Sequence, residues 1–123
     1  MTNDSARRLH ALFFPASRSC GHNRWCPLAD IYRTADGWLV KVELAGVRPE
    51  EISVTFSGRR LTIHGSRRDW TQREDHTHQV LEIAYSEFER SLELPADMGR
   101  AETTTTYQHG MLLIAIRKEE AAP

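Results

Sequence analysis

The sequence predicts an all-β protein, a sandwich or a barrel, and three observations support this class. Apolar and polar residues alternate with period two in five segments between positions 38 and 116, and such alternation gives each strand one buried and one wet face. Short glycine-containing turns separate several of these segments. Helical patterning is almost absent. A chain of 123 residues, 40% of them hydrophobic, is long enough for one domain with its own core.

Residues 1–27 are expected to form an N-terminal arm that is either flexible or a short helix. Ser5 could cap such a helix and Pro15 would end it. The arm carries the apolar residues Leu9, Leu12, Phe13 and Phe14. These are too few to form a core, so the arm would dock on the domain or on another chain; a loose tail is the alternative.

Two cysteines, Cys20 and Cys26, lie in the last part of this arm. No apolar run is long enough for a signal peptide or a membrane span, so we expect a cytoplasmic protein with a reduced cysteine pair. The alternative is a metal-binding or redox-responsive site formed by Cys20, His22 and Cys26. Their spacing matches no common zinc pattern, which disfavours the metal.

The domain is expected over 28–118, followed by a short tail at 119–123. The inward-facing residues of its five alternating segments are, in chain order, Trp38, Val40, Val42 and Leu44; Ile52, Val54 and Phe56; Leu61 and Ile63; Phe88, Leu92 and Leu94; and Leu112, Ile114 and Ile116. A further strand is expected over 103–107.

Turns are expected at Asp36-Gly37, Ser57-Gly58 and His109-Gly110. Glycine suits such turns because they require positive φ angles. Each turn stands beside an alternating segment, so together they predict a series of antiparallel strands.

Two features break the strand pattern. The segment 67–78 is polar and strongly charged but contains Trp70, and a long insert in a compact domain is usually functional or disordered. Arg90 occupies an inward position of its strand, where a charged group needs a partner. An ordinary salt bridge within the chain would supply such a partner.

Several function classes lack support. The sequence contains neither a glycine-rich phosphate loop nor a Gly-x-Ser-x-Gly motif, and no carboxylate pair stands in a recognisable pocket. We therefore expect no enzyme activity, no catalytic or metal-ligating residues and no cofactor. Sixteen basic and 17 acidic residues give a net charge of −1, which disfavours nucleic-acid binding.

From Trp25 to Glu119 the sequence resembles the α-crystallin domain of small heat shock proteins of the bacterial type. The resemblance rests on ordered short motifs. These are Pro27 to Tyr32, Val42 to Val47, Glu50 to Val54, Leu61 to Gly65, Phe88-Glu89-Arg90, Leu94-Pro95 and Gly110-Met111-Leu112. Ala45 stands where the family usually has proline, and Thr105 where it usually has alanine.

The resemblance implies an immunoglobulin-like antiparallel β-sandwich that acts as an ATP-independent holdase in the stress response. It also implies a homodimer in which loop 67–78 adds a strand to the edge of the partner's sheet, with small oligomers as a further step. The accepting edge is expected at 38–44. The candidate dimer-interface residues are Trp70, Glu74, His76, His78, Arg90, Trp38, Val40 and Val42.

Partly unfolded client proteins are the other expected partner. The candidate client-binding residues are Leu9, Leu12, Phe13, Phe14 and Trp25 in the arm, and Leu61 and Ile63 in the domain. The last two border a groove expected between 61–65 and 103–107. In the family that groove accepts an Ile-x-Ile tail, which is lacking after Ile116, so we expect dimers or small assemblies.

Two other functions stay open. The same sandwich could be a cochaperone-like or scaffold module that captures no client, because a fold does not determine a function. The cysteine segment could instead make the protein responsive to metal or redox state.

Overall fold

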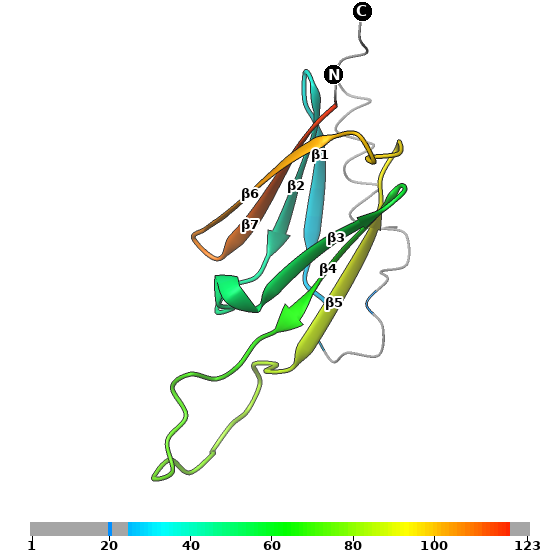
Figure 1. Cartoon of the computed structure of the whole chain (residues 1–123). Coiled ribbons are helices and arrows are strands. Elements are labelled where there is room, and N and C mark those ends of the chain that lie inside the picture. The colour runs from blue at the N-terminus through cyan, green and yellow to red at the C-terminus, as the bar shows by residue number, and fades with distance from the viewer. Residues whose placement is uncertain (1–19, 21–24, 119–123) are drawn as a thin grey trace, which may run out of the picture.

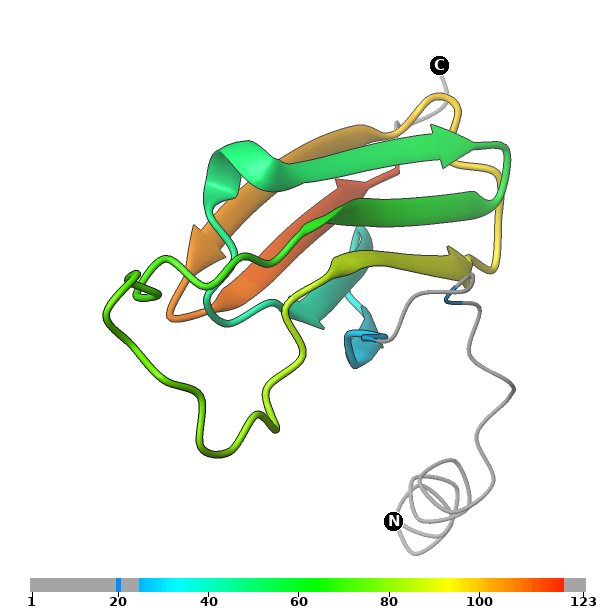
Figure 2. The same ribbon diagram turned by 90° about the horizontal axis from the view of Figure 1, so that it is seen from below.

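The computed structural model describes Cys20 and residues 25–118 and has two antiparallel sheets packed face to face (Figures 1 and 2). One sheet has the strand order β1-β2-β7-β6 and the other the order β3-β4-β5. The strands are β1 (Ala29–Arg33), β2 (Gly37–Glu43), β3 (Ile52–Ser57), β4 (Arg60–Ser66), β5 (Glu87–Glu93), β6 (Glu102–Gln108) and β7 (Met111–Arg117), with a 3-10 turn η1 (Pro49–Glu51). The predicted all-β sandwich is confirmed.

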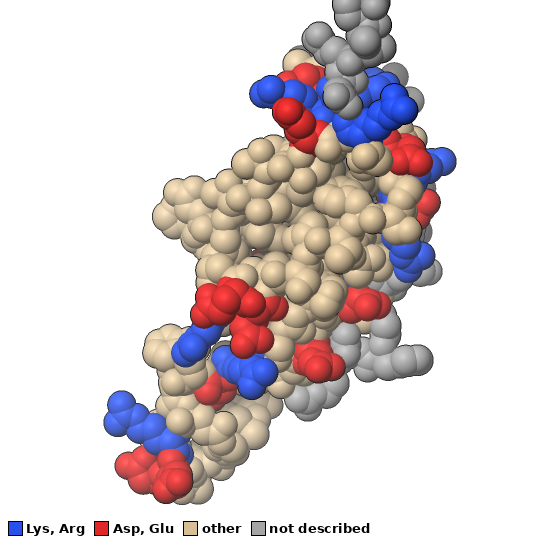
Figure 3. Space-filling model, viewed as in Figure 1, with Lys and Arg blue, Asp and Glu red and all other residues tan. Residues whose placement is uncertain are grey.

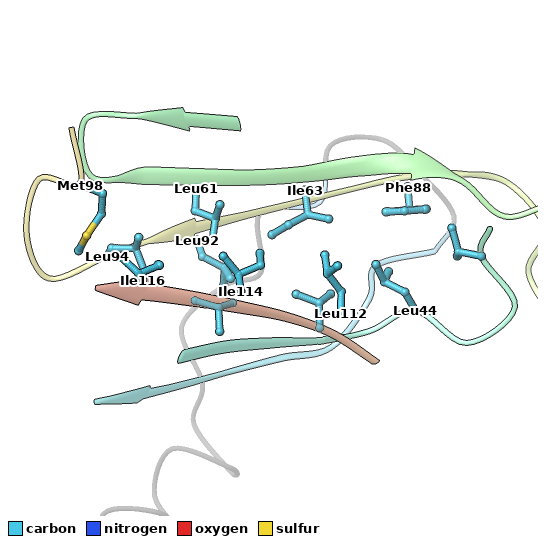
Figure 4. Packing of buried hydrophobic residues seen from close by; sticks show 13 residues of the cluster. Leu44, Leu61, Ile63, Phe88, Leu92, Leu94, Met98, Leu112, Ile114 and Ile116 are labelled. Carbon is cyan, nitrogen blue, oxygen red and sulfur yellow. The ribbon is translucent and has the colours of Figure 1, made fainter. Parts of the chain in front are cut away.

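Apolar side chains from both sheets meet between the layers (Figure 4). The buried hydrophobic residues are Val40, Val42, Leu44, Val47, Leu61, Ile63, Phe88, Leu92, Leu94, Met98, Leu112, Ile114 and Ile116. Most were predicted from the alternation. Trp38, Ile52, Val54 and Phe56 are only half-buried against this core; the last three lie on β3, an edge strand.

The turn between β6 and β7 has the geometry that its sequence predicts. Gln108 pairs with Met111, which leaves His109 and Gly110 as a two-residue loop. Both have positive φ, 56° and 76°, as a type I′ hairpin turn requires.

Gly37 is required for a different reason from the one predicted. It is not among the glycines with positive φ. Instead, a Cβ at this position would collide with the carbonyl oxygen of Ile116 on the neighbouring strand β7. Close approach of two backbones therefore explains this glycine.

The strand order overturns the expected accepting edge. β2 is hydrogen-bonded to β1 on one side and to β7 on the other, so a second chain cannot pair with it. Val40 and Val42 are fully buried and Trp38 is half-buried against the core. The assignment of Trp38, Val40 and Val42 to a dimer edge is therefore wrong, and the edge strand beside β2 is β1.

Candidate protein-interaction surface

A long loop leaves the sandwich between β4 and β5 and extends away from it (Figures 1 and 2). It covers residues 67–86 and is longer than the expected 67–78. Trp70, Val80, Leu81 and Ile83 are 63–73% exposed on it. Four large apolar side chains this exposed on one loop are unusual on a monomer and indicate an interaction site. The sequence prediction missed the last three, although Val80, Leu81 and Ile83 form a short apolar run ahead of β5.

Arg67 holds the base of this loop. Its Nε and Nη2 donate to the carbonyl of Ala84 at 2.9 and 2.7 Å, and its Nη1 donates to the carbonyl of Ala45 at 3.3 Å. Its backbone N–H donates to the carbonyl of Ser86 at 2.9 Å. Burial lowers the pKa of the Arg67 guanidinium, while Tyr85 and Glu43 act in the opposite direction. The two ends of the loop are therefore joined by one side chain.

The loop also has local order farther out. Thr71 donates to the Asp69 carboxylate from its hydroxyl at 2.6 Å and from its backbone N–H at 3.0 Å. These bonds lower the pKa of the Asp69 carboxyl. Gln72 and His78 are hydrogen-bonded to each other at 3.2 Å. The loop thus has hydrogen-bonded turns of its own.

The expected dimer residues of the loop are accessible. Trp70, Glu74, His76 and His78 are all exposed on it. Their contact with a partner stays a prediction. Arg90 is half-buried in β5, and its Nη1 donates to the Pro27 carbonyl at 3.2 Å. It therefore has a polar contact within its own chain, which ties β5 to the segment ahead of β1.

The outer edge of β1 is the second apolar element. Ile31 and Tyr32 are exposed on it, and Leu28 is exposed just before it. Within the part of the chain that the structure describes, β1 pairs only with β2, so its other side presents unpaired backbone groups. Such an edge can accept another strand.

A different surface lies over β3 and β6. In the face that Figure 3 shows, charged side chains gather toward the two ends and along the loop, and the middle carries very few.

The strand beside β6 at this side of the sandwich is β3, not β4 (Figures 1 and 2). The expected groove between 61–65 and 103–107 is therefore misplaced, because β4 is the central strand of its sheet.

The expected client-binding residues have different outcomes. Leu9, Leu12, Phe13 and Phe14 lie outside the described residues. Leu61 and Ile63 are fully buried and cannot contact a client, so that prediction is wrong. Trp25 does not extend freely from the domain. Its ring lies edge-on to Phe88, with centroids 5.1 Å apart, so this part of the arm docks on the domain, which was one of the expected alternatives, and its contact with a client stays a prediction.

Cys20 and Cys26 form a disulfide, with Cα atoms 5.4 Å apart. The expectation of a reduced pair is therefore wrong for this structure. The two sulfurs bond to each other, so neither is a thiolate ligand for a metal. Among the described residues there is also no group of three or more side chains able to hold a metal ion, and no helix with the length and hydropathy to cross a membrane.

Comparison with known proteins adds a further observation. The model of the Hsp20/alpha crystallin family matches residues 30–123. Small heat shock protein C2 of Rickettsia felis is 31% identical over 107 residues, which cover 87% of this chain and 69% of the relative. Small heat shock protein C4 of the same organism is 32% identical over 76% of this chain and 58% of its own length.

Solved structures agree with the fold. Heat shock protein 16.0 from Schizosaccharomyces pombe is 25% identical, covers 81% of this chain and 93% of its own, and gives a TM-score of 0.69. A small heat-shock protein from Xylella fastidiosa, described as having a distinct high order structure, is 27% identical and gives a TM-score of 0.66, with coverage of 81% and 92%.

Proposed function

Because this chain belongs to the Hsp20/alpha crystallin family, we propose that it is an ATP-independent chaperone. It would bind partly unfolded proteins and limit their aggregation during stress. The observation that carries this proposal is the group of exposed apolar side chains on loop 67–86 and along β1. They contrast with the core residues, which are buried. A cytoplasmic location is part of the proposal, because protein synthesis supplies partly unfolded chains there.

Holding a client requires binding energy but no chemical step. An unfolded protein exposes apolar side chains, and a protein that binds this state prevents its self-association by mass action. Each buried apolar side chain contributes roughly 1.5–3 kcal/mol, so a few contacts give reversible capture. Several adaptable sites also suit clients of different sequence better than one pocket does. We propose no catalytic residue and no cofactor.

Self-association is the second part of the proposal. The loop of one copy would place Val80, Leu81 and Ile83 on the β1 edge of a second copy, where Ile31 and Tyr32 are exposed. Pairing there would satisfy the open backbone groups of β1 and cover apolar surface on both chains. β6 is the other edge strand of this sheet. Pairing there would bury less apolar surface, because β6 presents four exposed threonines, Thr103 to Thr106. The high order structure of the Xylella fastidiosa protein supports assembly within the family.

The test is suppression of aggregation without ATP. A heat-labile client is warmed with the full chain, and light scattering is recorded. We expect the scattering to fall as the chain is added. A variant that lacks residues 1–19, and so loses Leu9, Leu12, Phe13 and Phe14 but keeps Cys20 and Trp25, is the matched comparison. It should suppress the scattering less at the same ratio to the client. Its number of subunits, measured by analytical ultracentrifugation, should equal that of the full chain.

The alternative is an interaction module that captures no client. It predicts that the full chain never slows aggregation at any ratio to the client, although it still self-associates. That outcome would reject the holdase and leave the family assignment intact.

A further inference from the structure

The Cys20–Cys26 disulfide is followed by a chain of contacts that reaches the base of the long loop. Trp25 lies between the two cysteines in the sequence and is half-buried against the sandwich. It forms an isolated parallel β-bridge with Phe88, the second residue of β5. The guanidinium carbon of Arg67 stands 3.6 Å from the centroid of the Trp25 ring. The disulfide is therefore linked to Trp25 through adjacent residues of the chain, and Trp25 is linked to Arg67 by direct contact.

The disulfide restrains Trp25 from one side and the fold restrains it from the other. Pro27, two residues after Trp25, is fully buried, so the chain is anchored beyond Cys26. With the disulfide formed, Trp25 lies inside a closed covalent ring and has fewer conformations available. Reduction opens the ring, so Trp25 keeps the Pro27 anchor and its contacts with Phe88 and Arg67 but loses the covalent restraint on its N-terminal side.

Trp25 in turn shields the bonds that close the loop. Its ring covers one face of the Arg67 guanidinium, whose donors reach the Ala84 and Ala45 carbonyls. A guanidinium with an aromatic ring over its face and less water around it forms stronger hydrogen bonds. Loss of this cover would admit water and weaken the closure at Arg67 and Ser86.

The disulfide is also open to reagents. Cys20 and Cys26 are both half-exposed. Cys26 borders a surface hollow of about 420 Å³, together with Trp25, Leu28, Glu43, Ala45 and Arg67. A small thiol can therefore approach the bond from solvent.

We infer that Cys20 and Cys26 form a redox-responsive modification site whose oxidation state controls, through Trp25 and Arg67, how firmly the base of loop 67–86 is closed. The reductant is a low-molecular-weight thiol and the oxidant its disulfide. One thiolate attacks a cysteine sulfur and expels the other cysteine as a thiolate, which takes up a proton. A second thiol then releases the first cysteine, so two thiols become one external disulfide while two cysteine thiols form. This inference goes beyond chaperone activity and does not depend on it.

The first test is the modification itself. The full-length protein is treated with oxidised glutathione or with dithiothreitol, and its free thiols are then alkylated and counted by intact mass. We expect no alkylation after oxidation and two alkylated cysteines after reduction, on a single chain. Retained glutathione, or a disulfide between two chains, would overturn the site.

The second test is the coupling. Hydrogen exchange is measured at the Arg67 amide, which donates to Ser86, in the oxidised and reduced protein. We expect exchange at least about threefold faster after reduction, since local opening becomes more frequent. The C20S/C26S variant is the matched control, because the chain has only these two cysteines. It should exchange at the reduced rate in either buffer.

A third variant tests the route. W25A should exchange at the fast rate even when oxidised and should lose the redox difference. Equal rates in oxidised and reduced wild-type protein would overturn the coupling, as would a redox difference that persists in C20S/C26S. A full redox difference in W25A would overturn the path through Trp25.

Discussion

The guanidinium carbon of Arg67 lies 3.6 Å from the centroid of the Trp25 ring. Trp25 precedes the first strand and Arg67 follows β4, so this contact joins two parts of the chain that are far apart in sequence. The same guanidinium bonds to Ala84, at the far end of the loop. One cation thus connects the segment ahead of β1 to both ends of the exposed loop.

Replacement of Arg67 should destabilise the protein much more than replacement of its neighbour. We expect Arg67→Ala to lower the free energy of unfolding by about 2 kcal/mol, because charged hydrogen bonds to the Ala84 and Ala45 carbonyls are lost. Arg68→Ala is the matched control. Arg68 is mostly exposed and its Nε lies 3.6 Å from Glu51, which predicts a loss below ~1 kcal/mol. Urea unfolding measures both, and equal losses would contradict the role of Arg67.

Replacement by alanine should destabilise the protein more at Gly37 than at Gly58. Gly58 has a φ of +62° and open space around it, so Gly58→Ala should cost about 1 kcal/mol from backbone strain alone. Gly37→Ala should cost more, about 3 kcal/mol, because the new Cβ meets the Ile116 carbonyl and forces β2 away from β7. Thermal unfolding of the two variants compares them. A milder effect at Gly37 would mean that the two strands separate easily.

The exposed apolar run of the loop should control self-association. Replacing Val80, Leu81 and Ile83 together by serine should reduce the sedimentation mass to that of a monomer, because the buried area of the contact is lost. Each subunit should stay folded, since all three side chains are exposed on the single chain, although the urea midpoint should fall by the stabilisation that association provides. Serine at the exposed loop positions Arg73, Asp75 and Thr77, none of them a candidate interface residue, is the control and should leave the mass unaltered. An unaltered mass in the first variant would reject the loop as the contact.

The stability of the hydrogen-bonded turn at Asp69 should decrease at acid pH. Hydrogen bonds from Thr71 lower the pKa of the Asp69 carboxyl below its ordinary value. The ionised carboxylate therefore stabilises the turn at every pH above the unfolded pKa, near 4. This contribution disappears as the pH falls through the lower folded pKa.

Removal of the Thr71 hydroxyl should raise the pKa of Asp69 toward its ordinary value. A titration followed by the NMR signal of the Asp69 carboxyl carbon compares Thr71→Val with Thr77→Val, a change elsewhere in the same loop. The second variant should titrate like the wild type. A pKa that is the same in wild type and Thr71→Val would show that the hydroxyl does not stabilise the ionised form.

Much of the sandwich follows from local pattern. Alternation identified the inward residues of β2, β4, β5 and β7, and the His109-Gly110 pair predicted the turn between β6 and β7. These signals are local, since they depend on which side a side chain points and on which φ a residue tolerates. β1 was harder to identify, because four of its five residues are exposed and an edge strand needs no strict alternation.

The sequence by itself determined the class of fold, the faces of the central strands and the presence of an exposed insert. Only the tertiary structure decided that β2 is internal while β1 is an edge, that Leu61 and Ile63 are sealed, and that Trp25 packs under Arg67. The order of strands in a sheet depends on hydrogen bonds between residues far apart in the chain. No spacing along the sequence encodes those bonds, whereas the two-residue period of a strand is set within the strand.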